Sequence, residues 1–299
     1  AREPRPAAPQ RDRRRGRRRR RLPPQRHEPR HHRRGRARRR RRARHHLSPG
    51  AGGGRGRVIA FVARDLRTGR CLASRERTRL PAFSTIKVLI AAAFWEAVAE
   101  GVLRETRVYA YQPWSGVGGS GVLRGFRHAA KLTLADCAHL MLAVSDNTAT
   151  NIVLAFLGLA RVNALAGRLG LADTVVQRAM MDEAAVREGR DNLTSAADLA
   201  ALLEELAVGT RLGPAVTGPV WASLEAQEHL DGIPRYLPPA AVYAGKCGDD
   251  SPAGRYTHDC GLVREGERRV VMAIMTDGGE GYEAVSRLGA ALYEALRDD

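Results

Sequence analysis

Ser84 and Lys87 stand three positions apart in an apolar stretch, PAFSTIKVLIAAA, that spans residues 81–93. Of the chain's 50 basic residues only three are lysines, and the other two are Lys131 and Lys246. Arginine keeps its proton in proteins, whereas a desolvated lysine can lose its proton and act as a base. Because residues i and i+3 share a helix face, with Cβ atoms about 5–6 Å apart, the Lys87 amine can reach the Ser84 hydroxyl. This spacing suits a serine nucleophile with a lysine base, and equally a capping serine followed by a lysine that extends to solvent.

Two more motifs follow along the chain, Ser-Asp-Asn at residues 145–147 and Lys-Cys-Gly at residues 246–248. The order S-x-x-K, S-D-N, K-x-G resembles that of the class A β-lactamases and the penicillin-binding proteins, and two of the three lysines fall on it. Longer stretches are also similar to a class A core, namely GSGVLRGF at 119–126 and LMLAVSDNTATN at 140–151. The resemblance covers nearly the whole chain except its N-terminal tail.

This resemblance implies a serine hydrolase that opens β-lactam amides through an acyl-serine intermediate and uses no metal or cofactor. Ser84 would be the acylated nucleophile, and Lys87 its hydrogen-bonded base, alone or through a water. Ser145 would pass a proton to the leaving nitrogen, while Asn147 would help to hold the substrate amide and Lys87. These roles are chemically sensible, because covalent catalysis by serine needs an adjacent base and a proton path to the leaving group.

The same resemblance assigns substrate binding to residues at the Lys-Cys-Gly motif. Lys246 would supply positive potential for the substrate carboxylate. The backbone N–H groups of Ser84 and of Asp249, just beyond Gly248, would form the oxyanion hole. Cys247 replaces the usual Thr or Ser, and because a thiol is a poorer donor than a hydroxyl, the carboxylate would be held less tightly.

Weaker candidates have simpler explanations beside the functional one. Arg235 in GIPRYLP and Arg255 are candidates to assist carboxylate binding, but ordinary surface arginines account for them equally well. For Asp146 we expect a structural role in fixing its loop. The stretch GVGGSG at 116–121 matches G-x-G-x-x-G, but no strand leads into it, so we expect a cleft-side loop rather than a dinucleotide site.

The segment RAMMDEAAVREGRDN, which begins at Arg178, corresponds to the loop that carries the water-activating glutamate of class A enzymes. Arg178 and Asp191 can form the ion pair that closes this loop. Met180 stands where the glutamate is expected, and the nearest carboxylates are those of Asp182 and Glu183. Either could act as the base if the loop is shaped differently. If neither does, release of the acyl group would be slow, as in a penicillin-binding D,D-peptidase or esterase.

Two other functions stay open from the sequence. A glutaminase of the same broad fold would hydrolyse the amide of free glutamine. A non-catalytic, nucleic-acid-binding protein would instead use the arginine-rich tail, and its binding would weaken with added salt. We expect the partner to be a small molecule, either a β-lactam or a peptidoglycan-like substrate, rather than a nucleic acid.

Strands at both ends of the chain and helices between them must position these residues. Two strands are expected at 58–66 and 71–78, and three more from the stretches VYAGKCG, YTHDCGLV and RRVVMAIMT after residue 240. The expected helices cover about 84–99, 134–145, 147–157, 161–169, 195–207 and 283–297. We therefore predict an α+β fold of the β-lactamase/transpeptidase-like type. It has a five-stranded antiparallel sheet flanked by N- and C-terminal helices, an all-helical insertion subdomain, and a cleft at the sheet's edge strand.

The first 50 residues differ sharply from the rest. They hold 22 arginines against 3 acidic residues, whereas residues 51–299 hold 28 basic and 29 acidic residues, so the net charge of +18 belongs to the tail. With almost no apolar residues, the tail cannot bury enough surface to offset its ordering entropy. We expect a disordered extension over residues 1–54 and one hydrolase domain over residues 55–299. No aromatic residues interleave the arginines, so an inert or non-native extension is favoured over a nucleic-acid-binding arm.

The four cysteines, Cys71, Cys137, Cys247 and Cys260, show no paired metal spacing, so no metal site is expected. Cys247 and Cys260 could pair with each other, but two free thiols are favoured. No apolar run reaches the ~20 residues of a membrane span, and we expect a monomer. The resemblance implies a secreted or cell-envelope protein, although no signal peptide is visible in residues 1–57.

Overall fold

The computed structural model describes residues 57–297. The extension expected over residues 1–54 lies outside this range, as does the place of an N-terminal helix before the first strand. Within the range, two strands open the chain, helices occupy its middle, and three strands and a helix close it. This order is the predicted one.

A five-stranded antiparallel sheet is built from both ends of the chain, in the order β2-β1-β9-β8-β7. Its strands are β1 (Val58–Asp65), β2 (Cys71–Ser74), β7 (Val242–Asp249), β8 (Tyr256–Glu265) and β9 (Arg268–Asp277). The central strand β9 is a nearly continuous apolar run because both faces of the sheet are covered. Strand β7, which carries the Lys-Cys-Gly motif, lies at an edge.

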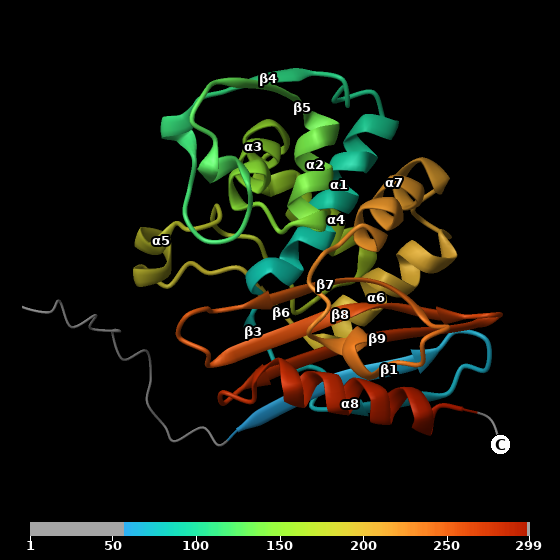
Figure 1. The fold of residues 1–299 in the computed structure, drawn as a ribbon. Helices are drawn as coiled ribbons and strands as arrows, with labels where there is room; N and C mark the ends of the chain where they lie inside the picture. Colours follow the sequence, from blue (N-terminus) through green and yellow to red (C-terminus); the bar gives the residue numbers. More distant parts are fainter. Residues whose placement is uncertain (1–56, 298–299) are drawn as a thin grey trace, which may run out of the picture. The chain divides into compact units, whose positions relative to one another are not determined.

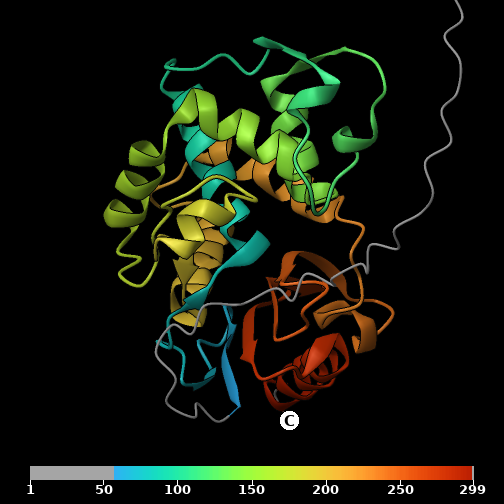
Figure 2. The ribbon, with the colours of Figure 1, turned by 90° about the vertical axis from the view of Figure 1, so that its left-hand side faces the viewer.

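Helices cover both faces of the sheet (Figure 1). The helices next to it are α1 (Lys87–Ala99), α6 (Ala196–Val208), α7 (Pro214–Glu225) and α8 (Gly281–Ala295). Helix α8 packs on one face through Val285 and Tyr293, which are buried in an apolar cluster with β8 and β9. The helical part of the chain lies on the opposite face, as the turned view also shows (Figure 2). The catalytic candidates must therefore lie where the helical part meets the edge of the sheet.

The helices of the insertion are α2 (Leu134–Ala143), α3 (Asn147–Leu157), α4 (Leu159–Leu169) and α5 (Glu183–Arg187). Two short two-stranded sheets accompany them. One pairs β3 (Leu80–Pro81) with β6 (Leu193–Thr194), and the other pairs β4 (Val108–Tyr111) with β5 (Ala130–Thr133). The predicted capping box opens α2, since Thr133 and Asp136 each accept the other's backbone N–H. Gly158 ends α3 with φ +78°. The sequence signals for these helix ends are therefore confirmed.

Helix α1 begins differently from the expectation. The predicted helix from residue 84 starts as a 3-10 turn, η1 (Phe83–Ile86), and continues as α1 from Lys87. From Val88 to Phe94 every side chain of α1 is buried, because α2, α3, α4 and α7 all pack around it. Ser84 and Lys87 thus lie at the end of a core helix.

Helix α7 is not predicted from the sequence, because Gly218 and Pro219 disfavour a helix interior. Buried Val216, Val220 and Leu224 follow one another at four-residue spacing and line one face of α7. Packing of this stripe against α1 and α2 therefore outweighs the local preference.

Within residues 57–297, no single helix is long and apolar enough to cross a membrane. Helices α3 and α4 reach the required length and composition only as a pair, and they are bent by 86° where they meet.

Candidate active site

Ser84 lines a cavity of about 460 Å³ between the end of strand β7 and the helical part of the chain. The wall of this cavity comes from η1, the glycine-rich loop at 119–124, the start of α3, the loop at 178–186 and the turn at 249–251. Segments that are distant in sequence thus converge on one hydroxyl. The predicted site residues that contribute to the wall are Ser84, Asn147, Glu183 and Asp249.

The backbone around Ser84 is tightly constrained. Phe83 has φ +45°, a left-handed conformation that a bulky residue adopts only where its surroundings impose it. Gly248 of β7 lies directly against the turn, and a Cβ atom there would be 2.7 Å from the nitrogen of Ser84 and 2.9 Å from that of Thr85. Glycine is therefore required at this position for β7 to approach the turn. The approach brings the end of β7, where Asp249 lies, next to the Ser84 amide.

Lys87 is fully buried and bonds to the Ser-Asp-Asn motif. Its Nζ lies 2.7 Å from the Ser145 carbonyl oxygen, 3.0 Å from Ser145 Oγ and 2.8 Å from Asn147 Oδ1. Three acceptors satisfy the three donors of an ammonium group. Among the described residues, the hydrogen bond expected between Lys87 and Ser84 is therefore not formed, and Lys87 is instead bonded to Ser145.

Two buried amines determine the electrostatics of this region. Lys87 and Lys246 are both 0% exposed. Burial and the positive charge of Lys246 hold the pKa of Lys87 well below its usual value, against the opposing effect of the Asp146 carboxylate. A neutral Lys87 can donate to the Ser145 carbonyl and to Asn147 while its lone pair accepts the Ser145 hydroxyl proton. The arrangement suits a lysine base that exchanges a proton with Ser145.

Asp146 fixes the glycine-rich loop, as expected. Its Oδ2 accepts from the backbone N–H groups of Val122 at 2.7 Å and Leu123 at 2.8 Å, and its Oδ1 accepts from Ala149 N at 2.8 Å. A Cβ atom at Gly121 would lie 2.4 Å from this carboxylate. The buried aspartate thus ties the loop to the first turn of α3.

Asn147 is held by the same loop. Its backbone N–H donates to the Ser120 carbonyl at 3.1 Å, and its Nδ2 donates to the Gly118 carbonyl at 3.0 Å. A Cβ atom at Gly119 would lie 2.5 Å from that Nδ2. The GVGGSG stretch is therefore a cavity-side loop packed against the Ser-Asp-Asn motif, and its glycines permit close approach to side chains.

The register of β7 and β8 decides the state of the thiols. Lys246 lies opposite Cys260, and Cys247 lies opposite Asp259. Directly opposite residues share one face of a sheet, so Cys247 and Cys260 point to opposite faces and cannot pair. Both are free thiols, as favoured from the sequence.

Cys247 does not have the surroundings expected of it. Alternation along β7 places its side chain on the same face as Tyr243, which α8 covers, and only 7% of Cys247 is exposed. It lies outside the cavity wall, unlike Asp249. The expected contact of Cys247 with a substrate carboxylate is thus not supported. Lys246 Nζ, on the other face, donates to the Cys247 carbonyl at 2.9 Å.

The two arginines proposed to assist carboxylate binding lie elsewhere. Arg235 Nη1 is 3.5 Å from Glu283 of α8, and Arg255 forms a two-pronged ion pair with Asp277. Neither arginine is part of the cavity wall, so the role expected for Arg235 is not supported. Arg124, which the sequence analysis did not single out, does line the cavity and forms no ion pair with another described residue. Its place in GSGVLRGF was visible, but the direction of its side chain was not.

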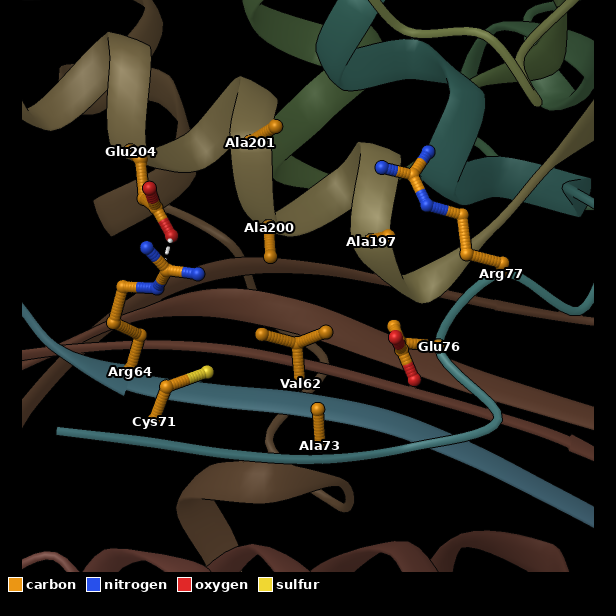
Figure 3. A pocket seen from close by; sticks show the side chains of 10 residues that line it. All are labelled: Val62, Arg64, Cys71, Ala73, Glu76, Arg77, Ala197, Ala200, Ala201 and Glu204. Carbon is orange, nitrogen blue, oxygen red and sulfur yellow. Dashed lines mark ion pairs between the residues drawn. The ribbon is translucent and has the colours of Figure 1, made fainter.

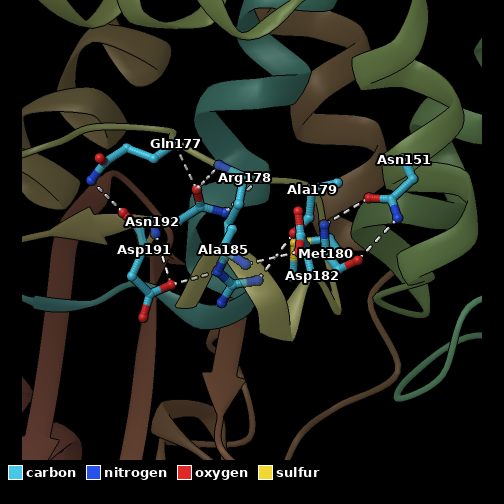
Figure 4. A network of polar contacts seen from close by, with 9 residues as sticks. All are labelled: Asn151, Gln177, Arg178, Ala179, Met180, Asp182, Ala185, Asp191 and Asn192. Atoms are coloured by element: carbon cyan, nitrogen blue, oxygen red, sulfur yellow. Dashed lines mark hydrogen bonds and ion pairs between the residues drawn. The ribbon is translucent and has the colours of Figure 1, made fainter. Parts of the chain in front are cut away.

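The ion pair expected to close the loop at 178–192 is present (Figure 4). Arg178 Nε lies 2.7 Å from Asp191 Oδ1. Asn192 Oδ1 accepts the backbone N–H groups of Gln177 at 2.8 Å and Arg178 at 3.1 Å. The two ends of the loop are thus joined by both side chains and backbone.

Asn151 of α3 holds Met180 in the middle of this loop (Figure 4). Its Oδ1 accepts from Met180 N at 2.8 Å, and its Nδ2 donates to the Met180 carbonyl at 3.0 Å. Met180 is 8% exposed and lines the cavity. An apolar thioether therefore occupies the place where the sequence pattern led us to look for a glutamate.

The two nearby carboxylates differ in their positions. Asp182 is outside the cavity wall, and its Oδ1 caps α5 by accepting from Ala185 N at 3.0 Å. Glu183 lines the cavity, but its side chain is 78% exposed and lies 3.7 Å from Arg187. Only Glu183 reaches the cavity, and it does so from a solvent-exposed helix start.

A second cavity, of about 320 Å³, lies between β1, β2 and α6 (Figure 3). Its charged groups include Arg64 and Glu204, which form an ion pair at 3.0 Å. Cys71 is exposed there, but no lysine or histidine lines this cavity, and the charge of Arg64, which lies opposite Cys71, is already paired with Glu204. The cavity at Ser84 is therefore the candidate active site.

In the part of the chain that the structure describes, no three histidine, cysteine or acidic side chains gather as a metal site would require. The expectation that the protein uses no metal stays a prediction.

Comparison with known proteins identifies a protein family that this chain matches. Residues 48–296 match the family described as the beta-lactamase enzyme family. The beta-lactamase regulatory protein BlaB of Streptomyces cacaoi is 30% identical over 129 residues, which are 42% of this chain and 41% of that protein. The match thus spans about two-fifths of the length of this relative.

Solved structures agree on the fold. A β-lactamase from Sphaerobacter thermophilus is 26% identical, with a TM-score of 0.75 over 82% of this chain and 94% of that one. PBP-A is 27% identical, with a TM-score of 0.72 over 80% of this chain and 90% of that one. An ancestral class A β-lactamase is 26% identical, with a TM-score of 0.72 over 80% and 94%. The predicted fold class is confirmed, and the chain belongs to the beta-lactamase enzyme family, whose β-lactamase- and penicillin-binding-protein-like hydrolases share this architecture.

Proposed function

We propose that this protein is a serine hydrolase that opens β-lactam amides by acylating Ser84 and then releases the acyl group slowly. The proposal rests on the difference between two sides of the Ser84 cavity, one with a buried base and one without a carboxylate at the expected position. Behind Ser84, a buried Lys87 is bonded to Ser145 and Asn147. Across the cavity, Met180 stands where a carboxylate would activate the releasing water.

Acylation uses the buried side of the cavity. Ser84 Oγ attacks the lactam carbonyl carbon, and the C–N bond of the ring breaks. Neutral Lys87 accepts the hydroxyl proton, directly or through a water. The Ser145 hydroxyl, 3.0 Å from Nζ, gives its proton to the ring nitrogen and takes one back from the Lys87 ammonium, which becomes neutral again. The N–H groups of Ser84 and Asp249 stabilise the oxyanion that forms on the way.

Substrate binding uses groups around this path. Asn147, whose amide lines the cavity, holds the substrate amide, and buried Lys246 gives the region a positive potential that attracts the substrate carboxylate. Arg124, which lines the same cavity without an ion-pair partner among the described residues, adds to this potential. An anionic β-lactam therefore matches the cationic groups of the site.

Release of the acyl group needs a base on the loop side. A thioether cannot accept a proton from water, and Asp182 already caps α5. Glu183 reaches the cavity, but its side chain is 78% exposed and lies 3.7 Å from Arg187, so its carboxylate is hydrated and is not held over Ser84. A variant of PBP-A, one of the similar structures, is described as an acyl-enzyme complex with penicillin G. A long-lived adduct on Ser84 is consistent with that relative.

A second candidate function is the sensing of β-lactams rather than their destruction. One relative, BlaB of Streptomyces cacaoi, is named as a regulatory protein, and a site that acylates and holds its ligand would report the presence of a β-lactam. This candidate shares the chemistry at Ser84 and differs in what the acylated protein contacts next.

Intact-mass spectrometry with penicillin G tests the proposal. Wild-type protein should gain the mass of one intact penicillin, peptide mapping should locate it on Ser84, and Ser84→Ala should show no adduct. Ser120→Ala is the matched control, since Ser120 lines the same cavity, and it should form the adduct as the wild type does. An adduct that persists in Ser84→Ala, or none in the wild type, would contradict the proposal.

A further inference from the structure

His258 of β8 lies behind the proposed nucleophile and has no part in the mechanism above. It is fully buried and pairs across the sheet with Gly248. Cross-strand partners share a face, so the imidazole lies on the face where Gly248 contacts the amides of Ser84 and Thr85. Because Gly248 has no side chain, the imidazole can reach the chain just before Ser84.

The partners of the ring fix its tautomer. Nε2 lies 2.9 Å from the Pro81 carbonyl oxygen, which can only accept, so Nε2 carries the hydrogen. Nδ1 lies 3.2 Å from Thr276 N, which can only donate, so Nδ1 offers its lone pair. The ring is therefore neutral, and it connects the central strand β9 to Pro81, three residues before Ser84.

This connection constrains the strained residue beside the nucleophile. The Phe83 ring packs on His258 at 5.8 Å and on Tyr256 at 5.3 Å between ring centroids. Phe83 keeps φ +45° only because the surrounding groups hold it there. The peptide that joins Phe83 to Ser84 carries the Ser84 N–H, so the direction of this donor follows from the Phe83 conformation.

We infer that His258 is a positioning residue whose Nε2–H holds the Pro81 carbonyl, fixes the conformation of Phe83 and thereby aims the Ser84 N–H at the substrate oxyanion. The inference rests on the proposed function, because it takes Ser84 as the nucleophile. Protonation would turn Nδ1 into a second donor facing the Thr276 N–H. The charged ring would still donate from Nε2 to Pro81 but would lose its bond to β9, so the ring links β9 to the turn only while it is neutral.

The surroundings of the ring favour its neutral form. Burial lowers the pKa of His258 below the usual value of 6.5, while hydrogen bonds with the backbone of Pro81 and Thr257 and, after them, the carboxylates of Asp250 and Asp249 oppose this effect. The groups that contact the ring from η1, β8 and β9 carry no charge: Phe83, Tyr256 and Thr276. The ring should thus stay neutral near pH 7 and become charged only in acid.

Two substitutions distinguish the effect of the hydrogen bond from His258 to Pro81 from the effect of the packing of its ring. His258→Gln keeps an N–H near the position of Nε2, and His258→Phe keeps only a ring. The rate constant for acylation by penicillin G is measured by intact mass between about pH 5 and pH 8. His258→Phe should acylate roughly 10- to 100-fold more slowly than wild type with an unchanged dissociation constant for the non-covalent complex, and His258→Gln should stay within about 3-fold.

The pH profile distinguishes positioning from simple packing. The ratio of the wild-type rate constant to that of His258→Gln should fall as the pH drops through the His258 pKa, because glutamine cannot be protonated. A ratio that stays constant down to a pH at which ¹⁵N spectra show a protonated His258 ring, or wild-type acylation by a folded His258→Phe, would overturn the inference. The matched control is His139→Gln on α2, where the imidazole bonds Ser223 Oγ and does not contact η1, and it should leave the rate unchanged.

A second readout does not depend on activity. In ¹⁵N spectra of histidine-labelled wild type near neutral pH, His258 should be neutral with the hydrogen on Nε2. A charged ring, or the hydrogen on Nδ1, would overturn the inference even if His258→Phe failed to fold. Absence of any Ser84 adduct in the wild type would instead refute the proposed function and leave the ring geometry to be decided by these spectra.

Discussion

The two sides of the Ser84 cavity differ in how their polar groups are arranged. On the side of α1 and the Ser-Asp-Asn motif, Lys87, Ser145 and Asn147 are buried and bonded to one another. On the side of the loop at 178–192, the polar side chains bond the loop backbone or one another, and Met180 stands closest to the place of a base. Chemistry is thus concentrated on one side, and structural support on the other.

This difference separates the two halves of the reaction. Acylation needs a base, a proton path and oxyanion donors, which the first side provides. Release needs an activated water, for which the second side offers only the exposed Glu183. A single fold can therefore hold a complete apparatus for forming an acyl-enzyme and an incomplete one for clearing it.

The largest effect is expected on the first side, from Lys87→Arg. Arginine keeps a positive charge but cannot accept a proton, so the acylation rate constant should fall by about 10²- to 10⁴-fold. Wild-type acylation should rise as the pH rises through the Lys87 pKa, which lies well below its usual value, because only the neutral amine is a base. Acylation is followed by intact mass across pH.

Lys131→Arg is the matched control for that change, since Lys131 is exposed on β5. It should acylate at the wild-type rate and keep the wild-type pH profile. Acylation by Lys87→Arg within a few-fold of the wild type would show that Lys87 is not the base.

On the side of the loop at 178–192, Met180→Glu should supply the carboxylate that is missing at this position. A carboxylate in the cavity wall at this position could activate water, and release of the acyl group should become roughly 10²-fold faster, at the lower end of general-base effects. The decay of the Ser84 adduct is measured by intact mass after removal of free penicillin G. Ala184→Glu, which adds a carboxylate to the same loop at an exposed position outside the cavity wall, should leave the decay unchanged. Equal decay in the wild type and Met180→Glu would refute the assignment of the loop.

Asp259 of β8 has a buried carboxyl group, and its titration should change the stability of the folded protein. Burial raises its pKa to about 6, while Tyr243 Oη and Ile233 N donate to it at 2.7 and 2.8 Å. Because the folded pKa exceeds the unfolded value of 3.8, the folded protein binds more protons between these values, and the free energy of unfolding falls as the pH rises through this window. The fall should be about 3 kcal/mol.

Asp259→Asn cannot titrate and should lose this part of the pH dependence. Urea unfolding of both proteins at about pH 4 and pH 7 gives the difference. An identical change in both would show that Asp259 is ionised throughout and that the pKa assignment is wrong.

The smallest effect is expected from the ion pair that closes the loop. Asp191→Ala removes the acceptor for Arg178 and for the Asn192 N–H, and the pair is only partly buried, so the free energy of unfolding should fall by about 1 kcal/mol. Glu188→Ala breaks the exposed pair with Arg190 in the same loop and should cost less than about 0.5 kcal/mol. Urea unfolding measures both, and equal effects would show that the Arg178–Asp191 pair does not stabilise the loop.

Features that depend on residue type and on order along the chain could be predicted from the sequence. The strand order, the helices other than α5 and α7, the edge position of the Lys-Cys-Gly strand and the Arg178–Asp191 pair follow from local patterns and the motif set. The placement of methionine at position 180 was also visible, because a missing carboxylate is a matter of residue identity.

Side-chain direction could not be predicted in the same way. Spacing on a helix allowed Lys87 to reach Ser84, but the carbonyl of Ser145 lies within reach only because the 145–147 turn folds back on α1. Cys247 follows Lys246 directly, and only the packing of α8 against the face that carries Tyr243 shows on which side its thiol lies. Long-range packing places Arg124 in the cavity wall and His258 beside Pro81, and such packing leaves no signal in the local sequence.

The contrast between the two sides is tested most directly by pre-steady-state hydrolysis of a chromogenic cephalosporin with intact mass recorded in parallel. The account predicts a burst of product equal to the enzyme concentration, a slow steady rate after it, and a Ser84 adduct that persists through both. Sustained turnover without a burst, with the adduct only fleetingly present, would mean that release is efficient and that the loop side holds a working base.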